Sequence, residues 1–292
     1  MGVYLKRYYD KPPVGSQIDW SHPLAKGLVG CWLMNEGGGR LVKDIVGRNN
    51  GSINAATMSY KRGNLNFTEN ATGYVRCKTG NIVGGNTNFT IISSARTSAP
   101  GHDASPGNPG AAANGGNAVY SERASTGNDI VKIDLFTLTG DGTNVSLEFT
   151  YRDDAGTLLQ IRAIKKGWND GKWHTYVAVK RAGTHLVYAD GKFESSGSYA
   201  GTATFTNANV SIIGNDFADT ASSWVGDIEY VYLYNRALSL SEIQQLYQAP
   251  YQFISVPKRR IYFLPAGAVS LPNPRRSITG VNRIKGIKSI TF

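Results

Sequence analysis

The stretch from residue 224 to residue 249 limits the fold of this chain more than any other part of the sequence. Its first half alternates side-chain types at every second position, which is the period of a β-strand with two different faces. Ser239 then stands three residues before Glu242, the spacing of an N-terminal capping box, and apolar residues follow at helical spacing. Pro250 ends the helix. The sequence therefore predicts one strand, a tight corner and one short helix.

Composition extends this prediction to the rest of the chain. Gly accounts for 34 of the 292 residues and Tyr for 16, while only 18% of the residues are charged. Short runs rich in Val, Ile, Thr and Tyr alternate with Gly and Asn turns, which is typical of all-β proteins. We expect one antiparallel domain with appendages, whose strands include the following segments. They are Leu28–Met34, Leu65–Phe67, Tyr74–Cys77, Phe89–Ser93, Ala118–Tyr120, Ile130–Leu138, Val145–Tyr151, Leu158–Ile164, His185–Ala189, Asn209–Ile213 and Trp224–Tyr234.

Three segments carry a family resemblance. The opening run from Gly27 to Glu36, the run from Trp168 to Lys180 and the ending from Trp224 to Ala249 resemble the first strand, a central strand and the last strand with its helix in laminin-G-like, concanavalin A-like domains. The resemblance covers residues 24–249. It implies an all-β, antiparallel jelly-roll β-sandwich with one short C-terminal helix. Because this fold serves lectins, adhesins, glycanases and structural modules, it does not by itself choose a function.

The chain divides into three parts on this basis. Residues 1–23 form an extended leader, in which prolines such as Pro12 and Pro13 oppose regular strand pairing. Residues 24–249 form the sandwich. Residues 250–292 form an extended basic arm, which has few apolar residues to bury by itself and is expected to become ordered on a partner.

Two further features of the sandwich leave alternatives open. Residues 97–117 contain no Leu, Ile, Val, Met, Phe, Tyr or Trp, so they predict a long Gly/Pro/Ala-rich loop that is either functional and mobile or a tolerated surface insertion. Cys31 and Cys77 stand in strand-like runs, where they are either two buried thiols or a disulfide pair. We favour the two thiols.

Charge is concentrated in the arm. Of the formal net charge of +10, eight Lys or Arg residues lie in residues 250–292 without any Asp or Glu, and the other 249 residues hold 23 basic and 21 acidic residues. Such an arm suits nucleic acid, an anionic surface or an acidic groove. Apolar residues between the cations favour a protein partner, joined by strand addition. The predicted partner-binding residues are Lys258, Arg259, Arg260, Ile261, Tyr262, Phe263, Arg275, Arg276, Arg283, Lys285 and Lys288.

Catalytic and metal-binding patterns are weak. Glycanases of the resembled fold carry carboxylates at positions i, i+2 and i+4 of one strand, where they share a face. Here Asp227 and Glu229 match two of these positions and Val231 occupies the third, so we predict no catalytic residue, no enzymatic activity and no organic cofactor. Calcium, the optional ion of the resembled family, takes oxygen ligands in loops. Its weak candidates are Asn215, Asp216 and Asp219.

Histidines and tryptophans offer other hypotheses. His174 and His185 belong to adjacent predicted strands and could approach each other across a hairpin, although a histidine on a strand face is usually structural. Trp168 and Trp224 could form an aromatic platform for a sugar, or they could belong to the core. The core is the favoured assignment.

The function expected from resemblance is structural. The opening from Trp20 to Val29 and the run from Ala249 to Arg260 are similar to those of laminin-G-like proteins encoded by bacteriophages. This implies a non-enzymatic virion structural or decoration protein, made in the host cytoplasm, whose sandwich points outward and whose termini bind capsid or tail proteins. We expect a homo-oligomer or a larger assembly and no membrane partner. Nucleic acid is a less favoured partner than protein. The alternative is a glycan-binding adhesin, and a glycoside hydrolase is the third hypothesis.

Overall fold

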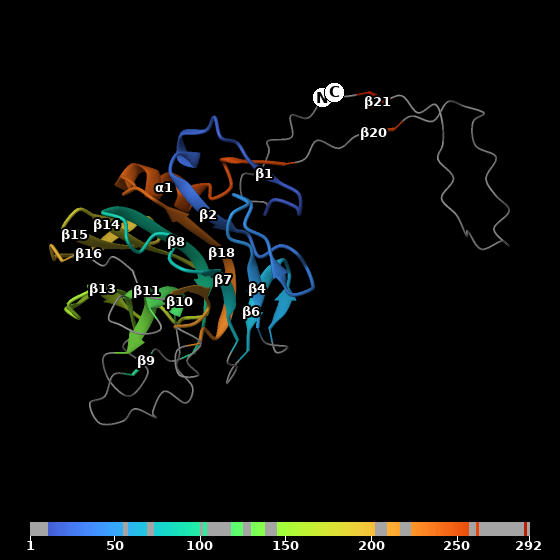
Figure 1. Ribbon diagram of the computed structural model, residues 1–292. Coiled ribbons are helices and arrows are strands. Elements are labelled where there is room, and N and C mark those ends of the chain that lie inside the picture. The colour runs from blue at the N-terminus through green and yellow to red at the C-terminus, as the bar shows by residue number, and fades with distance from the viewer. Residues whose placement is uncertain are drawn as a thin grey trace, which may run out of the picture. The chain divides into compact units, whose positions relative to one another are not determined.

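A computed structural model describes residues 11–54, 58–68, 73–99, 102–103, 118–124, 130–137, 145–201, 209–216, 223–256, 261–262 and 289–290. The chain divides into two compact units, Met1–Ser255 and Val256–Phe292. The first unit is a sandwich of two sheets with a short helix (Figure 1). The second unit contributes β20 (Ile261–Tyr262), which pairs antiparallel with β21 (Ser289–Ile290).

The first sheet has nine strands among the described residues. Its order is β13-β12-β11-β10-β17-β7-β4-β3. β9 pairs in parallel with the C-terminal end of β11, which β10 does not reach. All its other pairs are antiparallel. Its strands are β3 (Leu41–Val42), β4 (Gly51–Ile53), β7 (Val75–Thr79), β9 (His102–Asp103), β10 (Ala118–Ala124), β11 (Ile130–Thr137), β12 (Val145–Arg152), β13 (Leu158–Lys166) and β17 (Asn209–Ile213).

The second sheet has eight strands among the described residues. Its order is β16-β15-β14-β8-β18-β6-β5, and β2 pairs with β18 beyond the end of β6. Its strands are β2 (Leu28–Trp32), β5 (Ser59–Lys61), β6 (Asn64–Phe67), β8 (Asn88–Arg96), β14 (His174–Arg181), β15 (Thr184–Ala189), β16 (Lys192–Ser198) and β18 (Gly226–Tyr234). All these pairs are antiparallel, as the sequence predicts.

The main core lies between the two sheets because strand residues alternate between faces. On β12, Val145, Leu147, Phe149 and Tyr151 are buried in this core, and the residues between them point to the other face of the sheet. Trp168 and Trp224 are also buried here, at 1% and 0% exposure. The two tryptophans are therefore core residues, and the sugar platform considered for them is not formed.

A second core covers the outer face of the eight-stranded sheet. It joins tyrosines of β18 and apolar residues of β8 and β14 to the helix α1 (Leu240–Gln248), the 3₁₀ turn η1 (Pro23–Ala25) and the pair β1 (Gln17–Ile18) with β19 (Ile254–Ser255). Two expectations need correction. The leader does form a strand pair, β1 with β19, because its prolines lie outside β1. The sandwich also continues beyond residue 249, because Tyr251, Phe253 and Ile254 are buried in this core.

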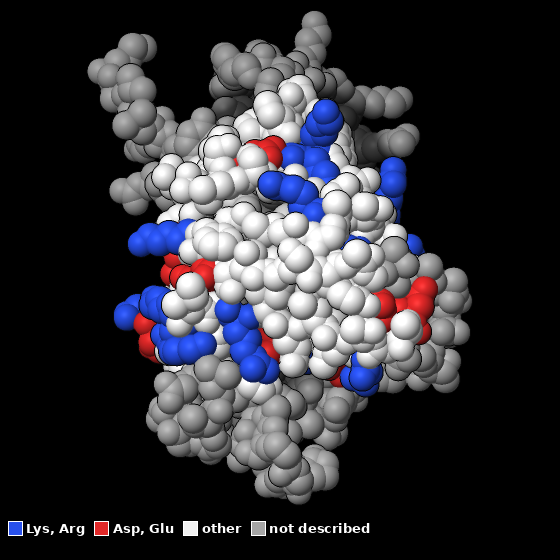
Figure 2. Space-filling model, turned by 90° about the vertical axis from the view of Figure 1, so that its left-hand side faces the viewer, with Lys and Arg blue, Asp and Glu red and all other residues white. Residues whose placement is uncertain are grey.

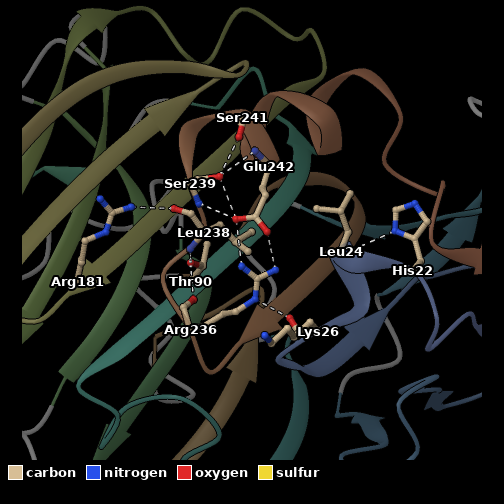
Figure 3. Close-up of polar contacts among 10 residues, drawn as sticks. All are labelled: His22, Leu24, Lys26, Thr90, Arg181, Arg236, Leu238, Ser239, Ser241 and Glu242. Carbon is tan, nitrogen blue, oxygen red and sulfur yellow. Dashed lines mark hydrogen bonds and ion pairs between the residues drawn. The ribbon is translucent and has the colours of Figure 1, made fainter.

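The corner before α1 locks the helix to the sheet (Figure 3). Ser239 and Glu242 form the predicted capping box. Arg236 pairs with both carboxylate oxygens of Glu242, at 3.0 and 2.8 Å, and its Nε donates to the backbone carbonyl of Lys26 at 2.6 Å. Thr90 on β8 accepts a hydrogen bond from the backbone N–H of Leu238 at 3.0 Å. The side chain of Thr90 and the backbone carbonyl of Lys26, from two distant segments, thus help to fix the helix N-terminus.

Other predictions about the chain can now be placed. Cys31 and Cys77 are free and buried, as favoured. Within the loop predicted at residues 97–117, the described part includes the short strand β9, and residues 100–101 and 104–117 lie outside the described residues. Among the residues that the structure describes, no helix is both long and apolar enough to cross a membrane.

Candidate ligand-binding face

A charged layer lies on the outer face of the nine-stranded sheet. Because Val131, Ile133 and Leu135 of β11 point into the main core, Lys132 and Asp134 point to the opposite side of the sheet. Strand register then sets their neighbours, since residues directly opposite each other on adjacent strands share a face. We call the group Arg123, Lys132, Asp134, Glu148, Thr150, Arg152, Gln160, Arg162 and Asp216 the outer-face cluster.

Glu148 is the carboxylate of the cluster that accepts the most hydrogen bonds. It stands opposite Asp134 on one side and Arg162 on the other. The hydroxyl of Thr150 and the amide of Gln160 donate to Oε1 at 2.8 and 3.0 Å, and Nε of Arg162 donates to Oε2 at 2.6 Å. The guanidinium of Arg162 also lies 4.0 Å from the centre of the Phe136 ring. Donors from β12 and β13 therefore hold this buried side chain in one position.

Asp134 and Asp216 share the ammonium group of Lys132. Nζ of Lys132 lies 3.0 Å from Oδ2 of Asp134 and 3.5 Å from Oδ2 of Asp216, and Arg123 contacts the same Asp216 oxygen at 3.4 Å. Burial raises the pKa of Asp134 to about 7, against the lowering effect of Lys132 and with a further increase from Glu148. Burial alone would lower the pKa of Lys132, but Asp134 and Asp216 outweigh it and raise that pKa. Burial therefore makes the carboxyl of Asp134 a weaker acid than an exposed aspartate.

Three buried polar atoms of the cluster have no hydrogen-bond partner. They are Oδ1 of Asp134, Oδ1 of Asp216 and Nε of Arg152. Two of them are acceptors and one is a donor. A buried polar atom without a partner is unfavourable by about 1–3 kcal/mol, so these atoms stand out within the charged layer. Because these atoms are buried, they can bond to a ligand only when the side chains above them move.

The cluster is layered from the sheet outward. The carboxylate side chains of Asp134, Glu148 and Asp216 are 3%, 1% and 9% exposed. Two of the cationic side chains are more exposed, Arg123 at 37% and Arg162 at 32%, while Lys132 is 13% exposed. Anything arriving from solvent therefore meets guanidinium groups before it meets carboxylates.

The side of the sandwich that carries the edge strands β13 and β16 has few charges at its centre. Figure 2 looks onto this side and shows a broad uncharged middle, around which Lys and Arg alternate with Asp and Glu. This even mixture agrees with the near-neutral balance of the chain outside the arm. Charge alone therefore singles out no large patch in this view.

The weak calcium candidates are not assembled as a site by the described residues. Asn215 is buried and its amide nitrogen donates to Ser223 at 2.8 Å, while Asp216 faces two cations. Asp219 lies outside the described residues. In the described part of the chain, no group of three or more His, Cys, Asp and Glu side chains is placed to hold a metal ion. Calcium stays a prediction without support from this loop.

Asp227 and Glu229 have structural partners. Asp227 accepts hydrogen bonds from Nε of Arg96 at 2.8 Å and from Asn66 at 2.7 Å. Glu229 accepts from the hydroxyls of Ser94 and Tyr251, each at 2.7 Å. These bonds join β18 to β8, to β6 and to the segment after α1. They give both carboxylates a role in the fold.

The two strand histidines do not approach each other. In the register of β14 and β15, His185 stands opposite Lys180, whereas His174 begins β14 at the other end of the hairpin. His174 lies between Asp190 and Asp170, at 2.8 and 3.0 Å from their carboxylates. His185 is fully buried beside Tyr151, with a ring distance of 4.8 Å, and neither ring nitrogen has a hydrogen-bond partner. The hypothesis of a histidine pair is therefore wrong.

The predicted partner-binding residues of the arm fall mostly outside the described residues. Only the backbone of Ile261 and Tyr262 is described, as strand β20. Lys258, Arg259, Arg260, Phe263, Arg275, Arg276, Arg283, Lys285 and Lys288 lie outside the described residues. Their role in binding a partner stays a prediction.

Sequence reasoning did not find the outer-face cluster. The signal was present as polar residues at every second position in three successive runs, for example Lys132 and Asp134 in the first and Glu148 and Thr150 in the second. Alternation shows that these residues leave the core, but it does not show which of them face one another. That depends on strand register, which includes a bulge between Ser146 and Glu148.

Comparison with known proteins agrees with the predicted fold. A family model described as the concanavalin A-like lectin/glucanases superfamily matches residues 108–244. No curated protein sequence matches the chain. The matched segment includes strands of both sheets and most of α1. Together with the sandwich described above, it confirms an antiparallel jelly roll of the concanavalin A-like type.

Solved structures show the same fold at low sequence identity. Domain 4 of an extracellular arabinanase from Geobacillus stearothermophilus, solved with arabinotriose, is 15% identical, with a TM-score of 0.56 over 75% of this chain and 97% of that domain. The binding domain of Paraclostridial Mosquitocidal Protein 1 is 17% identical, with a TM-score of 0.55, 78% of this chain and 53% of that one covered. A Trypanosoma rangeli sialidase solved with sialic acid is 18% identical, with a TM-score of 0.54, and only 33% of it is covered. The chain thus spans about half of the toxin domain and a third of the sialidase.

Proposed function

We propose that this chain is a non-enzymatic carbohydrate-binding module that holds its ligand on the outer face of the nine-stranded sheet. The observation that carries the proposal is the set of unpartnered buried atoms, two acceptors on Asp134 and Asp216 and one donor on Arg152. A sugar hydroxyl both donates and accepts a hydrogen bond, so hydroxyls along an oligosaccharide can satisfy both kinds of atom. The arabinanase domain with bound arabinotriose and the sialidase with sialic acid support the same class of ligand.

Access to these atoms depends on the layer above them. Lys132, which is 13% exposed, and the exposed Gln160 are long side chains that can rotate without moving the strands. Carbohydrate would displace or share their present hydrogen bonds. The carboxylates below are fixed by the sheet, so the acceptors of the site are preorganised, which favours affinity.

Binding without hydrolysis is supported by the state of the carboxylates. Both oxygens of Glu148 already accept hydrogen bonds, and Asp227 and Glu229 join strands to one another. We expect no release of reducing sugar from any polysaccharide that binds. Release that disappears in Glu148→Gln or Asp134→Asn would show that the cross-strand carboxylate pair is catalytic, and the module would then be a hydrolase.

A glycan array with purified protein tests the binding function. We expect binding that falls at least about tenfold in Gln160→Ala, since this removes a ligand-facing amide. Gln252→Ala is the matched control, because Gln252 also makes one exposed hydrogen bond, at 3.0 Å to the carbonyl of Gln245 on the far side of the other sheet. Absence of binding to every glycan, or equal loss in both variants, would contradict the proposal.

Attachment of this module to a virion is the second part of the proposal. Its support is the separate compact unit Val256–Phe292, which contains all eight cations of the predicted arm. We expect the arm to bind a capsid or tail protein, while the sandwich faces outward toward a host glycan. Loss of particle incorporation in a chain ending at Ser255 is the expected result, and normal incorporation would show that the arm is not the anchor.

The salt dependence of binding distinguishes a protein partner from a nucleic-acid partner. A protein-bound arm should resist moderate salt, because buried apolar contacts do not weaken when counterions are added. A nucleic-acid-bound arm making about eight phosphate contacts should lose orders of magnitude in affinity between about 50 and 200 mM salt. A steep salt dependence with DNA, together with no binding to virion proteins, would overturn the protein assignment.

A further inference from the structure

We propose that the outer-face cluster selects acidic sugars, meaning saccharides that carry a carboxylate, and that Arg162 is the residue that determines this specificity. The inference rests on the proposed carbohydrate-binding function and names the chemical class of its ligand. It follows from three observations on the cluster: the order of its layers, the geometry of Arg162 and the balance of its charges.

The order of the layers decides which charges a ligand meets. Arg162 and Arg123 have about a third of their side-chain surface exposed, whereas the carboxylates of Glu148 and Asp134 are 1% and 3% exposed. A carboxylate on the ligand therefore approaches guanidinium groups first and is separated from the protein's own carboxylates. The reverse order, with carboxylates outside, would repel an acidic sugar.

Arg162 is held in a position that suits a second carboxylate. Its Nε bonds to Glu148 at 2.6 Å and its guanidinium lies against Phe136 at 4.0 Å, so its orientation is fixed from below and from the side. Because Nε is the nitrogen used by Glu148, the two terminal nitrogens remain for a ligand. Parallel N–H donors of a guanidinium match the two oxygens of a carboxylate, and a preorganised arginine loses little entropy on binding.

Charge balance leaves room for one more anion. The ion pairs of the cluster match Arg123, Lys132 and Arg162 with three carboxylates, and Arg152 adds a cation whose Nε is unpartnered. One ligand carboxylate would balance this excess. This charge balance predicts a ligand with a single carboxylate in the site.

The pH dependence follows from the groups around Asp134. Lys132 of its own strand, Glu148 of β12 and Asp216 after β17 are the charged groups that act on it. Arg162 of β13 reaches it through Glu148. Because the pKa of Asp134 is raised to about 7, the carboxylate gains a proton below that pH, and the cluster becomes more positive. Affinity for an acidic sugar should therefore increase as the pH falls from 8.5 to 5.5, roughly the two sides of this transition.

Matched saccharide pairs test the specificity. The probes are acidic glycans that bind on the array and the same glycans after chemical reduction of the carboxylate to an alcohol, with 3′-sialyllactose and lactose as a second pair. Titration calorimetry on the full chain should give at least about tenfold weaker binding for the uncharged member, the size expected for loss of a charge-assisted hydrogen bond. Equal affinity of the two members would overturn the inference.

Variants assign the effect to Arg162. Arg162→Gln should weaken the acidic member about 10- to 100-fold and bring it close to the neutral one. Arg162→Lys keeps a positive charge beside Glu148 and should still lose most of the preference, since it lacks the fork of donors. Arg181→Gln is the matched control, because Arg181 also donates one hydrogen bond, to the carbonyl of Leu238 at 3.2 Å, on the other sheet (Figure 3). Equal weakening of acidic and neutral members would show a structural role for Arg162 and overturn its assignment.

The outcomes for the two proposals are separable. An array on which only neutral glycans bind overturns the acidic specificity and leaves the carbohydrate-binding function in place. An array on which no glycan binds overturns the function itself. The comparison of acidic and reduced ligands uses the unaltered protein, so it does not depend on whether any variant folds.

Discussion

The segment between α1 and the arm should decide the stability of the sandwich. Two shortened chains differ only by this segment: one ends at Ser255 and the other at Pro250. The shorter chain lacks Tyr251, Phe253 and Ile254, which are 4%, 0% and 8% exposed in the second core. At about 1.5–3 kcal/mol for each buried large apolar side chain, their loss removes roughly 4–9 kcal/mol.

Hydrogen bonds made by the same segment add to this effect. Without it, the Tyr251 hydroxyl no longer donates to Glu229, and the backbone N–H of Asp19 has no carbonyl of Phe253 to bond to, a hydrogen bond of 2.9 Å in the full chain. The pairing of β1 with β19 also disappears. Because a domain is usually stable by about 5–15 kcal/mol, the chain ending at Pro250 should be largely unfolded or only marginally stable.

Urea unfolding followed by tryptophan fluorescence and circular dichroism measures the difference. We expect the chain ending at Ser255 to unfold cooperatively, and the chain ending at Pro250 to lose most of its free energy of unfolding. Phe253→Ala in the longer chain should cost about 3–5 kcal/mol, and Gln252→Ala, next to it but half-buried, should cost less than about 1 kcal/mol. Equal stability of the two shortened chains would refute the assignment of residues 251–255 to the core.

Three further predictions concern single residues. His185→Phe should raise the free energy of unfolding by about 1–3 kcal/mol, because it removes unpartnered ring nitrogens. Burial lowers the pKa of His185 to about 4, so the wild type should also lose stability relative to this variant as the pH falls from 6.5 to 4. A variant that is less stable than the wild type in a pH series of urea unfolding would disprove this. Burial opposes protonation of His174, but its hydrogen bonds to carboxylates, including Asp190, outweigh burial and raise its pKa. The stabilisation of the fold by protonated His174 should be complete below pH 6.5 and lost at higher pH, so His174→Gln should lower the free energy of unfolding more at pH 5.5 than at pH 8.5. A loss that does not depend on pH would contradict this. Arg236→Ala should lower thermal stability by the equivalent of about 1–3 kcal/mol, because it removes the ion pair with Glu242 and the hydrogen bond to the backbone carbonyl of Lys26. An unchanged melting temperature would show that this residue does not hold the corner in place.

The fold could be predicted largely from local signals. The alternation before residue 235 and the capping-box spacing of Ser239 and Glu242 both occur in the structure as expected. These signals are local because strand alternation and helix capping depend on neighbouring residues. The pairing of β1 with β19 was missed, since it joins residues 17–18 to residues 254–255 and each strand is only two residues long.

The candidate site needed information that the sequence does not contain in readable form. Asp227 and Glu229 are adjacent acids on one strand and were easy to notice, yet each is held by partners from other elements. Asp134 and Glu148 come from different strands and meet only through the register of β11 with β12. A reading by spacing within one strand therefore found the structural acids and missed the cluster, because contacts across strands have no fixed spacing along the chain.

The most direct test of the carbohydrate-binding face is to map where a bound glycan perturbs the protein. Backbone amide shifts of the isotope-labelled chain, titrated with the tightest glycan from the array, should change mainly on β11, β12 and β13, around Lys132, Thr150 and Gln160. Residues of the second core, such as Leu246, should remain unchanged. Shifts confined to α1 or to the end of the sandwich that carries Trp173, with none on these three strands, would contradict the account.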